Sequence, residues 1–248
     1  MAKSDPYPSM RLLTYNIHKG IGGRDRRYRF DRIIQVIEKE NPDIICLQEV
    51  DRHEKRSHFH DQPRMLAENF NASCSLFQLN VPKTSGGYGN LLLSRWPFHC
   101  RHQISLSFAN KKPRGAQLAV VETPEGLLHL VNFHLGLAGK ERHWQIKHLL
   151  GHPLFRESAH LPTLITGDFN DWRNKLGKAH FADQQFEQAT APPSRFRSFP
   201  AFFPVASLDK AFFRGDLFVR QVRVVRSRLA KRASDHLPVV IDFHLRTL

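Results

Sequence analysis

Short apolar runs separated by polar segments recur along most of the chain, and their spacing predicts more strands than helices. Met10–Ile17 and Ile44–Val50 are mostly apolar, as expected of strands buried on both faces. Within Phe30–Glu40 the apolar residues fall at helical spacing, which predicts an amphipathic helix that ends at the Asn-Pro-Asp sequence of residues 41–43. The same criteria predict a helix at Lys140–Leu150 and strands at Asn90–Ser94, Gln117–Glu122, Leu127–Leu135, Pro162–Thr166, Leu208–Phe213, Leu217–Val225 and Leu237–Phe243.

These elements predict one domain built from packed sheets with helices outside them. Strands dominate, and few helices lie between them, which favours sheets packed against each other. Residues 1–9 are polar and proline-containing, so we expect a flexible leader, followed by a single domain over residues 10–248. Residues 172–207 are rich in proline and phenylalanine and read as a mixed loop region.

Polar residues with acid-base or metal-binding chemistry stand at the ends of these apolar runs. Each has an ordinary explanation when taken alone: Asn16 can cap a turn, Asp168 can form one, and His134 can be a core histidine. Their joint occurrence at strand ends favours a functional site, because a rigid sheet edge holds side chains in fixed positions. The residues concerned are Asn16, His18, Gln48, Glu49, His134, Asp168, Asn170, Asp209, Asp235 and His236.

Composition excludes several classes of protein. Hydrophobic residues make up 41% of the 248 residues, which is too many for a disordered chain. The sequence has no apolar stretch long enough for a membrane span, and its first ten residues lack the apolar core of a signal peptide, so we expect a cytoplasmic protein. The three cysteines form no CxxC pair, which argues against a disulfide framework or a cysteine zinc site.

The chain has a formal net charge of +14, which suggests a polyanionic partner such as nucleic acid, an anionic membrane surface or a phosphorylated substrate. Simple solubility is the alternative explanation. One basic cluster, containing Arg24 and Arg26, follows the first strand, and a second, between Arg220 and Arg232, precedes Asp235. Both clusters adjoin the polar strand ends, where they would form an electropositive rim.

Seven sequence blocks span the predicted strand ends: TYNIH (14–18), LQEV (47–50), GNLLLSRWP (89–97), VNFHLG (131–136), TGDFN (166–170), SLDKAFF (207–213) and SDHLPV (234–239). In order and spacing they resemble the endonuclease/exonuclease/phosphatase superfamily, and in particular its small bacterial members. The resemblance covers residues 11 to about 244. It implies a DNase I-like four-layer α/β sandwich, in which two packed mixed β-sheets are flanked by helices, and metal-dependent hydrolysis of a phosphoester.

The resemblance also implies roles for individual residues. Glu49 would be the principal ligand of a Mg²⁺ ion, or of Mn²⁺ in its place, with Asn16 beside it and Asp235 as a further ligand. Asp168 would orient or deprotonate the attacking water. The remaining catalytic residues would be His134, Asn170, Asp209 and His236, where Asn170 holds phosphate or water, Asp209 orients His236, and both histidines face the phosphate.

The residue types suit this chemistry. Carboxylate and amide oxygens are the ligands that Mg²⁺ prefers, and a carboxylate bonded to a histidine stabilises an imidazolium that can face phosphoryl charge. His18 stands where many nuclease relatives carry an acid, which favours a single metal at Glu49 and Asn16. We assign His18, Asn90, Arg24 and Arg26 to substrate binding.

The predicted function is therefore divalent-metal-dependent phosphoester hydrolysis, with a phosphodiesterase or nuclease preferred because of the basic charge. A lipid or small-molecule phosphodiesterase or phosphatase is the alternative, and a non-enzymatic nucleic-acid-binding relative is the second. Phe199, Phe202 and Phe203 are candidates to border an apolar or base-stacking pocket. We expect a monomer that takes an anionic phosphoester, with nucleic acid or peripheral contact with anionic lipid as further options.

Overall fold

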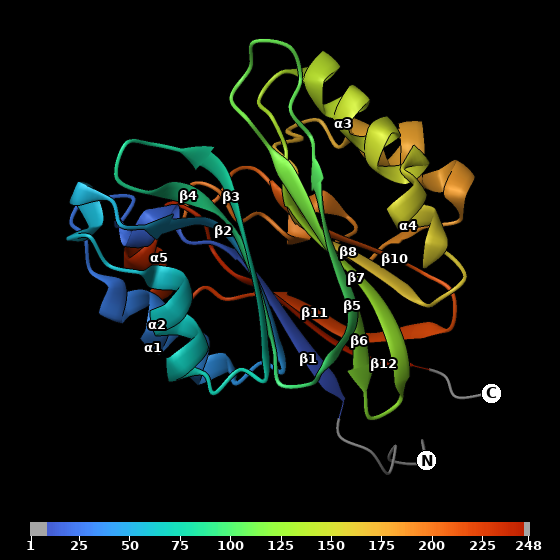
Figure 1. Ribbon diagram of the computed structural model, residues 1–248, viewed down its shortest axis with the longest axis horizontal. Helices are drawn as coiled ribbons and strands as arrows, with labels where there is room; N and C mark the ends of the chain where they lie inside the picture. The colour runs from blue at the N-terminus through green and yellow to red at the C-terminus, as the bar shows by residue number, and fades with distance from the viewer. Residues whose placement is uncertain (1–8, 246–248) are drawn as a thin grey trace.

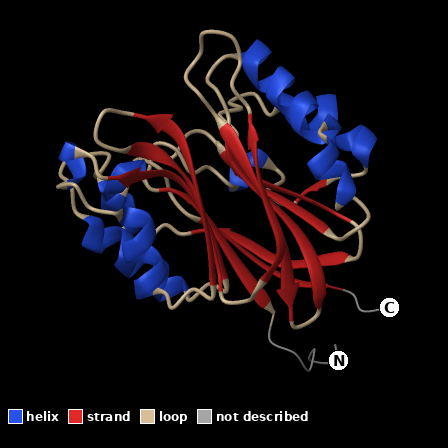
Figure 2. Ribbon diagram, viewed as in Figure 1, coloured by secondary structure: helices blue, strands red, loops and turns tan. Residues whose placement is uncertain are grey.

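The computed structural model describes residues 9–245 and contains two six-stranded β-sheets packed face to face (Figure 1). The predicted leader, residues 1–9, lies outside the described residues except for Ser9. Helices cover the outer face of each sheet (Figure 2). This arrangement confirms the predicted four-layer α/β sandwich.

The first sheet is mixed, with strand order β11-β12-β1-β2-β4-β3. β1 and β2 run parallel, and the neighbouring pairs are antiparallel. The parallel pair brings the carboxyl ends of two strands to one edge, so Asn16 and Gln48 are register partners there. The strands are β1 (Met10–Asn16), β2 (Ile44–Arg52), β3 (Cys74–Pro82), β4 (Gly87–Ser94), β11 (Leu217–Val224) and β12 (Val239–Leu245).

The second sheet has strand order β5-β6-β7-β8-β10-β9 and is also mixed. β7 and β8 run parallel, which places His134 opposite Asp168, and the antiparallel strand β10 places Asp209 opposite Asp168 as well. The strands are β5 (Phe98–Ser105), β6 (Gly115–Thr123), β7 (Gly126–His134), β8 (Thr163–Asp168), β9 (Glu187–Gln188) and β10 (Asp209–Arg214).

Five α-helices and several short helical turns complete the described fold. Helices α1 (Phe30–Glu40), α2 (Gln62–Asn69) and α5 (Ala230–Ala233) lie against the first sheet, and α3 (Gly139–Gly151) and α4 (Pro153–Glu157) lie against the second. Within residues 9–245, every helix is too short or too polar to serve as a membrane span. The short turns are η1 (His18–Gly20), η2 (Lys55–Ser57), η3 (Gly177–Phe181), η4 (Ala182–Gln184) and η5 (Pro193–Arg195).

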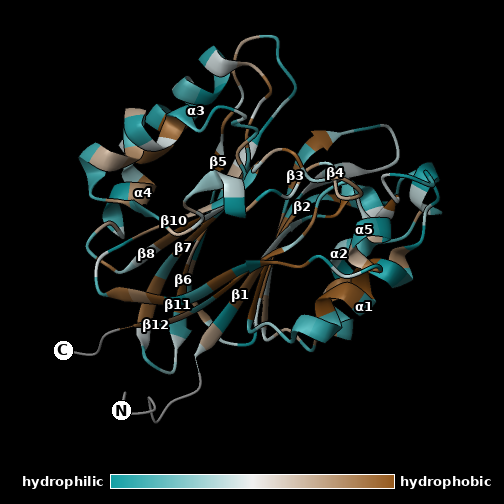
Figure 3. Ribbon diagram, turned by 180° about the vertical axis from the view of Figure 1, so that it is seen from behind, coloured by the Kyte–Doolittle hydropathy of each residue, from teal (hydrophilic) through white to brown (hydrophobic). Residues whose placement is uncertain are grey.

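Three apolar layers hold the four structural layers together. One lies between the sheets and includes Leu12 and Cys46, while the other two lie between each sheet and its helices, around Leu13 and Phe133. Leu12 and Leu13 are adjacent in sequence and serve different layers, because successive side chains of a strand point to opposite faces. This is why β1 and β2 are mostly apolar, and Figure 3 shows the hydrophobic colouring concentrated along strands.

The predicted helix over Phe30–Glu40 is confirmed with the same bounds, and Lys140–Leu150 is confirmed as the body of α3. The sequence did not predict β3 and β5. Each is an edge strand with one exposed face, so its apolar pattern is weak. The sequence of β5, FHCRHQIS, therefore carries few apolar residues, and its side chains alternate between exposed and half-buried. The region 172–207 is mostly irregular, as expected, with three short helical turns and the two-residue strand β9.

The layer between the two sheets changes from apolar to polar along its length. Inward positions recur at every second residue of a strand. On β1 the sequence of inward residues passes from Met10 and Leu12 to Thr14 and Asn16, and all four are buried. The other strands change in the same direction, through Ile44, Cys46 and Gln48 on β2, Leu128, Leu130, Asn132 and His134 on β7, and Leu164, Thr166 and Asp168 on β8.

Asn132 joins the sheets where this change occurs. Its side-chain oxygen accepts a hydrogen bond from Gln48 Nε2 at 2.8 Å, and its Nδ2 donates to Gln117 Oε1 at 2.8 Å. The same Nδ2 lies within hydrogen-bond distance of the carbonyl oxygens of Leu47 (3.2 Å) and Leu91 (3.3 Å). One fully buried amide thus connects β7 with β2, β4 and β6.

Removing this amide is expected to destabilise the sandwich. In Asn132→Ala the buried Gln117 Oε1 loses its donor, and Gln48 Nε2 keeps only its longer contacts to Thr14 Oγ1 and the Cys46 carbonyl oxygen. An unpaired buried polar group is costly. We expect the free energy of unfolding to fall by about 3 kcal/mol, measured by urea denaturation. Asn110→Ala, at an exposed position, is the control and is expected to change it by less than about 0.5 kcal/mol. Equal effects of the two substitutions would contradict the role given to Asn132.

His129 on β7 is expected to make the fold sensitive to acid. Burial, with a smaller contribution from the Arg214 guanidinium, lowers the pKa of His129 to about 4. The unfolded chain, with a histidine pKa of about 6.5, takes up a proton first. Neutral His129 therefore contributes its full share to the free energy of unfolding above about pH 6.5. This contribution is lost as pH falls towards 4, by up to about 1.4 kcal/mol per pH unit. Urea denaturation at several pH values in this range is expected to show a smaller decrease in the free energy of unfolding for His129→Gln than for the wild type. Parallel plots of the free energy of unfolding against pH for the two proteins would contradict this.

Candidate active site

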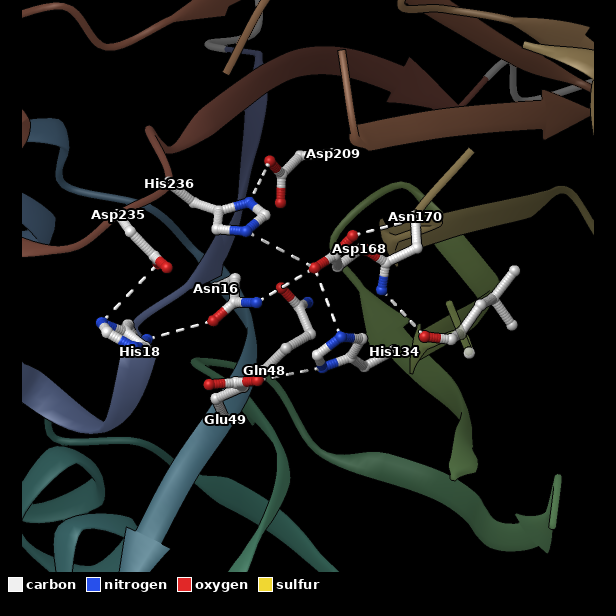
Figure 4. A network of polar contacts seen from close by, with 12 residues as sticks. Asn16, His18, Gln48, Glu49, His134, Asp168, Asn170, Asp209, Asp235 and His236 are labelled. Carbon is white, nitrogen blue, oxygen red and sulfur yellow. Dashed lines mark hydrogen bonds and ion pairs between the residues drawn. The ribbon is translucent and has the colours of Figure 1, made fainter. Parts of the chain in front are cut away.

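The polar end of the inter-sheet layer gathers side chains from both sheets into one network (Figure 4). Asn16 lies at the end of β1 and Glu49 lies in β2, both in the first sheet. His134 and Asp168 end β7 and β8 of the second sheet, and Asp209 begins β10. The structure therefore brings together residues that are up to 220 positions apart, including His236, which directly precedes the segment leading into β12.

Asp168 is the centre of this network. Its Oδ2 accepts a hydrogen bond from Asn16 Nδ2 at 3.0 Å and lies 3.4 Å from His134 Nε2 and 3.7 Å from His236 Nε2. Its Oδ1 accepts from the backbone N–H of Asn170 at 3.0 Å. Burial raises the pKa of Asp168 to about 6, while the His236 charge opposes that rise. A carboxylate with such a pKa can exchange a proton with water near neutral pH.

Asp209 fixes the orientation of His236. Asp209 Oδ2 lies 2.8 Å from His236 Nδ1 and accepts a hydrogen bond from Ser198 Oγ at 2.5 Å. His236 Nε2 therefore points towards Asp168 (Figure 4). Burial alone would lower the pKa of His236, but the Asp209 and Asp168 carboxylates raise it to about 10. The imidazole is accordingly charged at neutral pH, between two carboxylates.

His134 lies between Glu49 and Asp168, and its pKa is shifted in the opposite direction from that of His236. Its Nδ1 is 4.0 Å from Glu49 Oε1, and its Nε2 is the atom that faces Asp168. Burial, together with the nearby Arg114 guanidinium, lowers the pKa of His134 well below its ordinary value. The site thus combines one neutral and one charged histidine around the same carboxylate.

A bulge in β2 directs Glu49 into the site. The register between β2 and β4 shifts between Leu47 and Val50, so one extra residue is accommodated, and Glu49 has a φ of 55°. Bulges re-aim side chains and are common beside active sites. Glu49 forms an ion pair with Lys19 of η1, and burial alone would raise its pKa. The Lys19 ammonium, together with His134 and His18, outweighs burial and holds the pKa of Glu49 well below its usual range.

Several site residues have left-handed backbone conformations, which are uncommon for residues other than glycine. They are His18 (φ 45°), Lys19 (φ 62°), Glu49 (φ 55°) and Asn170 (φ 50°). Such conformations persist only where surrounding contacts hold them. Asn170 is held by Asp168 through its backbone and by the carbonyl oxygen of Leu135, to which its Nδ2 donates at 2.9 Å.

Other predicted residues lie around this centre. His18 donates its backbone N–H to Asn16 Oδ1 at 3.0 Å, and its ring lies 3.8 Å from Asp235 Oδ1. Asp235 thus faces His18 rather than the Asp168 carboxylate (Figure 4). Asn90 is buried, and its Nδ2 donates to the carbonyl oxygen of Gly115 at 3.0 Å, which ties β4 to β6. Its predicted contact with substrate stays a prediction.

Arg24 and Arg26 are exposed in the loop that joins η1 to α1. Gly23 packs so closely on Asp235 that an added Cβ would lie 2.6 Å from the Asp235 Cα. This contact places the arginine loop beside the segment that carries His236. Two arginines of the second basic cluster make contacts within the fold. Arg223 pairs with Glu40, and Arg226 donates to the backbone carbonyl oxygens of residues 195 and 197.

Three residues of the site were missed by sequence reasoning. Lys19 pairs with Glu49, Ser198 bonds to Asp209, and Lys210 is a buried lysine directly after Asp209. Burial lowers the pKa of Lys210 to about 8, against the raising effect of Asp171 and Asp209. Lys19 and Lys210 are adjacent in sequence to His18 and Asp209, which were singled out, so proximity along the chain was the available signal.

Two places in the network have the donor atoms for a metal ion. Among residues 9–245, ligand atoms of Asp168, Asp209 and His236 lie within 4.8 Å of one another, and Asp209 Oδ1 has no hydrogen-bond partner. A metal there would have to displace the proton on His236 Nε2, which faces Asp168. The second place is Glu49, whose ionised carboxylate already pairs with the Lys19 ammonium. Carboxylate oxygens are ligands that Mg²⁺ prefers.

Comparison with known proteins gives a consistent family and fold. The sequence profile described as "Endonuclease/Exonuclease/phosphatase family" matches residues 13–236. Uncharacterized protein YbhP of Escherichia coli strain K12 is 29% identical over 249 residues, covering 96% of this chain and 97% of YbhP.

Two solved structures illustrate the shared fold. An endonuclease/exonuclease/phosphatase from Beutenbergia cavernae superposes with a TM-score of 0.80 at 23% identity, over 96% of this chain and 72% of that one. The mannosyl-6-phosphatase Bt3783 of Bacteroides thetaiotaomicron superposes with a TM-score of 0.77 at 18% identity, over 96% and 100% of the two chains. The profile match over most of the chain shows that this protein belongs to the endonuclease/exonuclease/phosphatase family of phosphoester hydrolases.

Proposed function

We propose that this protein is a divalent-metal-dependent phosphodiesterase. The observation that carries the proposal is the convergence of Asn16, His134 and His236 on the buried Asp168 carboxylate. These residues come from both sheets, and their amide, imidazole and carboxylate groups would act as acid, base and charge-stabilising groups around one point. A purely structural ion pair would not need a neutral and a charged histidine on the same carboxylate.

Glu49 and Asn16 are the residues that would hold a Mg²⁺ or Mn²⁺ ion. Glu49 offers an ionised carboxylate, and Asn16 Oδ1 has a second lone pair beyond the one that accepts from the His18 N–H. A bound divalent cation supplies charge stabilisation to phosphoryl oxygens and acidifies a water molecule. Asp235 is the further candidate ligand. Its carboxylate lies beside the His18 ring, so it would act on the metal through a bridging water molecule.

The chain's own residues would divide the remaining work. Asp168 accepts a proton from the attacking water, and Asn16 and the backbone of Asn170 hold that carboxylate in position. His236, held by Asp209 and charged, faces the phosphoryl oxygens, where a fixed positive charge is most useful. His134 is neutral and can contact a phosphate oxygen, while His18, Asn90, Arg24 and Arg26 remain proposed substrate contacts.

A nuclease-type substrate is favoured by the net charge of +14. A lipid phosphodiester is the second candidate, and a specific observation favours it. Large apolar side chains, including Leu137 and Trp172, are exposed on the loops that directly follow His134 and Asp168. A small-molecule phosphoester remains the other alternative from the sequence.

Substitution of the proposed metal ligand tests the function. With bis(p-nitrophenyl) phosphate and Mg²⁺, the wild-type protein is expected to hydrolyse the diester, and EDTA is expected to abolish turnover until excess Mg²⁺ restores it. We expect Glu49→Gln to lower kcat/KM by roughly a hundredfold or more, because the neutral amide binds the cation weakly. His236→Gln is expected to lower kcat by a similar factor, because its charge faces the phosphoryl group.

The matched control is Glu122→Gln, which makes the same chemical change at an exposed position on β6. It is expected to retain the wild-type rate. Full activity in Glu49→Gln would contradict the metal role of Glu49. Absence of turnover on diesters, nucleic acid, phospholipid and phosphomonoesters would contradict the proposed enzyme function and favour a binding protein.

A further inference from the structure

An apolar rim lies beside the active site at the catalytic end of the sandwich. Nine large apolar side chains are exposed among residues 9–245, and five of them form this rim, with exposed fractions between 50% and 75%. They lie on the loops that follow β7 and β8 and on the loop that precedes β10, next to strands that carry site residues. The apolar rim consists of Leu137, Trp172, Phe202, Phe203 and Val205.

Contacts between these loops make the rim continuous with the active site. The Trp172 ring packs edge-on against Phe199, with ring centroids 5.8 Å apart, and Phe199 lies 4.8 Å from the His236 ring. Phe199 also begins the hairpin that presents Phe202 and Phe203, because the N–H groups of Val205 and Ala206 donate to its carbonyl oxygen. The Ala201 N–H donates to the carbonyl oxygen of Asp235, which anchors the hairpin beside the site.

A pocket of about 440 Å³ separates Trp172 from the start of α3, where the Leu137 loop ends. Its lining includes Lys140, Arg142, Arg173 and Lys175. The rim is therefore an apolar edge interrupted by cationic side chains, and not a groove shaped for one helix or strand.

The charges on the three loops are of one sign at the surface. Residues 136–143, 170–176 and 194–206 contain two acids, Glu141 and Asp171, and both are buried. Glu141 Oε2 accepts from the N–H of Ala138, and Asp171 Oδ2 accepts from the N–H of Leu176. The exposed charged residues of the same loops are all basic: Lys140, Arg173, Lys175, Arg195 and Arg197.

We propose that this catalytic face docks on an anionic phospholipid surface, with the apolar rim entering the interface and the basic side chains facing lipid phosphates. Aromatic and aliphatic side chains flanked by Lys and Arg are the composition of interfacial membrane contacts. The inference rests on the proposed function, because it takes the reacting phosphoester to lie at Asp168 and Glu49. The reacting group would then be a phosphoester of a lipid headgroup.

A nucleic-acid surface fits the rim less well. Nucleic-acid interfaces are polar and use aromatic rings as stacking platforms for bases. Leu137 and Val205 have no stacking face and no polar group, and they are among the exposed members of the rim. Hydrocarbon at a bilayer interface accepts such side chains, whereas a phosphate backbone does not.

Vesicle binding tests the proposal without requiring turnover. Full-length protein is mixed with vesicles of phosphatidylcholine alone, or of phosphatidylcholine and phosphatidylglycerol in equal parts, and bound protein is measured by flotation. We expect binding to the anionic vesicles and little to the neutral ones. The double substitution Phe202→Ser and Phe203→Ser is expected to lower the partition coefficient roughly tenfold or more, because two apolar anchors are lost.

Phe218→Ser is the matched control. Phe218 is 48% exposed on β11, where it pairs with His244 at the end of the sheet opposite the active site. It is expected to bind vesicles as the wild type does, and thermal unfolding of all variants checks that they fold. Equal losses from the two substitutions, or unchanged binding in the double variant, would overturn the proposal.

Two further arms separate the alternatives. Glu49→Gln is expected to keep vesicle binding while losing hydrolysis, so failure of the proposed enzyme function leaves this measurement intact. Duplex and single-stranded DNA are titrated with the same variants. A larger effect of the rim substitution on DNA binding than on vesicle binding would assign the face to nucleic acid and overturn the lipid proposal, as would absence of binding to anionic vesicles.

Discussion

The geometry of the site depends on the polar end of the layer between the two sheets, where Asn132 closes an amide network with Gln48 and Gln117. Burying amides is costly unless each finds a partner, so this network admits one relative position of the two sheets. Glu49 directly follows Gln48, and His134 lies two residues after Asn132 on the same strand face. The position of the catalytic groups across the sheet interface therefore follows from the hydrogen bonds beneath them.

The site itself uses burial to separate the charge states of similar groups. His134 and His236 are both buried and both face carboxylates. Asp209 and Asp168 outweigh burial at His236 and raise its pKa, whereas burial and the Arg114 guanidinium outweigh Glu49 at His134 and lower its pKa. Glu49 and Asp168 differ in the same way, because Lys19 pairs with Glu49 while burial dominates at Asp168. These differences suit Glu49 to the proposed role of cation ligand and Asp168 to the proposed role of proton acceptor.

Much of this was predictable from the sequence, because alternation along strands determines which residues face inward. Asn16, Glu49, His134 and Asp168 were identified from apolar runs that stop at a polar residue, and three of them end strands, whereas Glu49 lies at the bulge inside β2. The ion pair of Lys19 was not predictable, since it depends on a left-handed turn at η1 and a bulge in β2. The edge strands β3 and β5 were missed because one face of each is exposed to solvent. The exposure of Phe202 was not predictable either, because it depends on how the long loop before β10 packs.

Anomalous scattering from crystals grown with Mn²⁺ would locate a bound metal and test the proposed metal ligands directly. We expect a peak at the Glu49 carboxylate and the Asn16 amide oxygen, with Lys19 displaced from Glu49. We also expect His236 to remain hydrogen-bonded to Asp209. A peak between Asp168, Asp209 and His236, with Lys19 still paired to Glu49, would contradict the division of the network into a metal-binding part and a proton-transferring part.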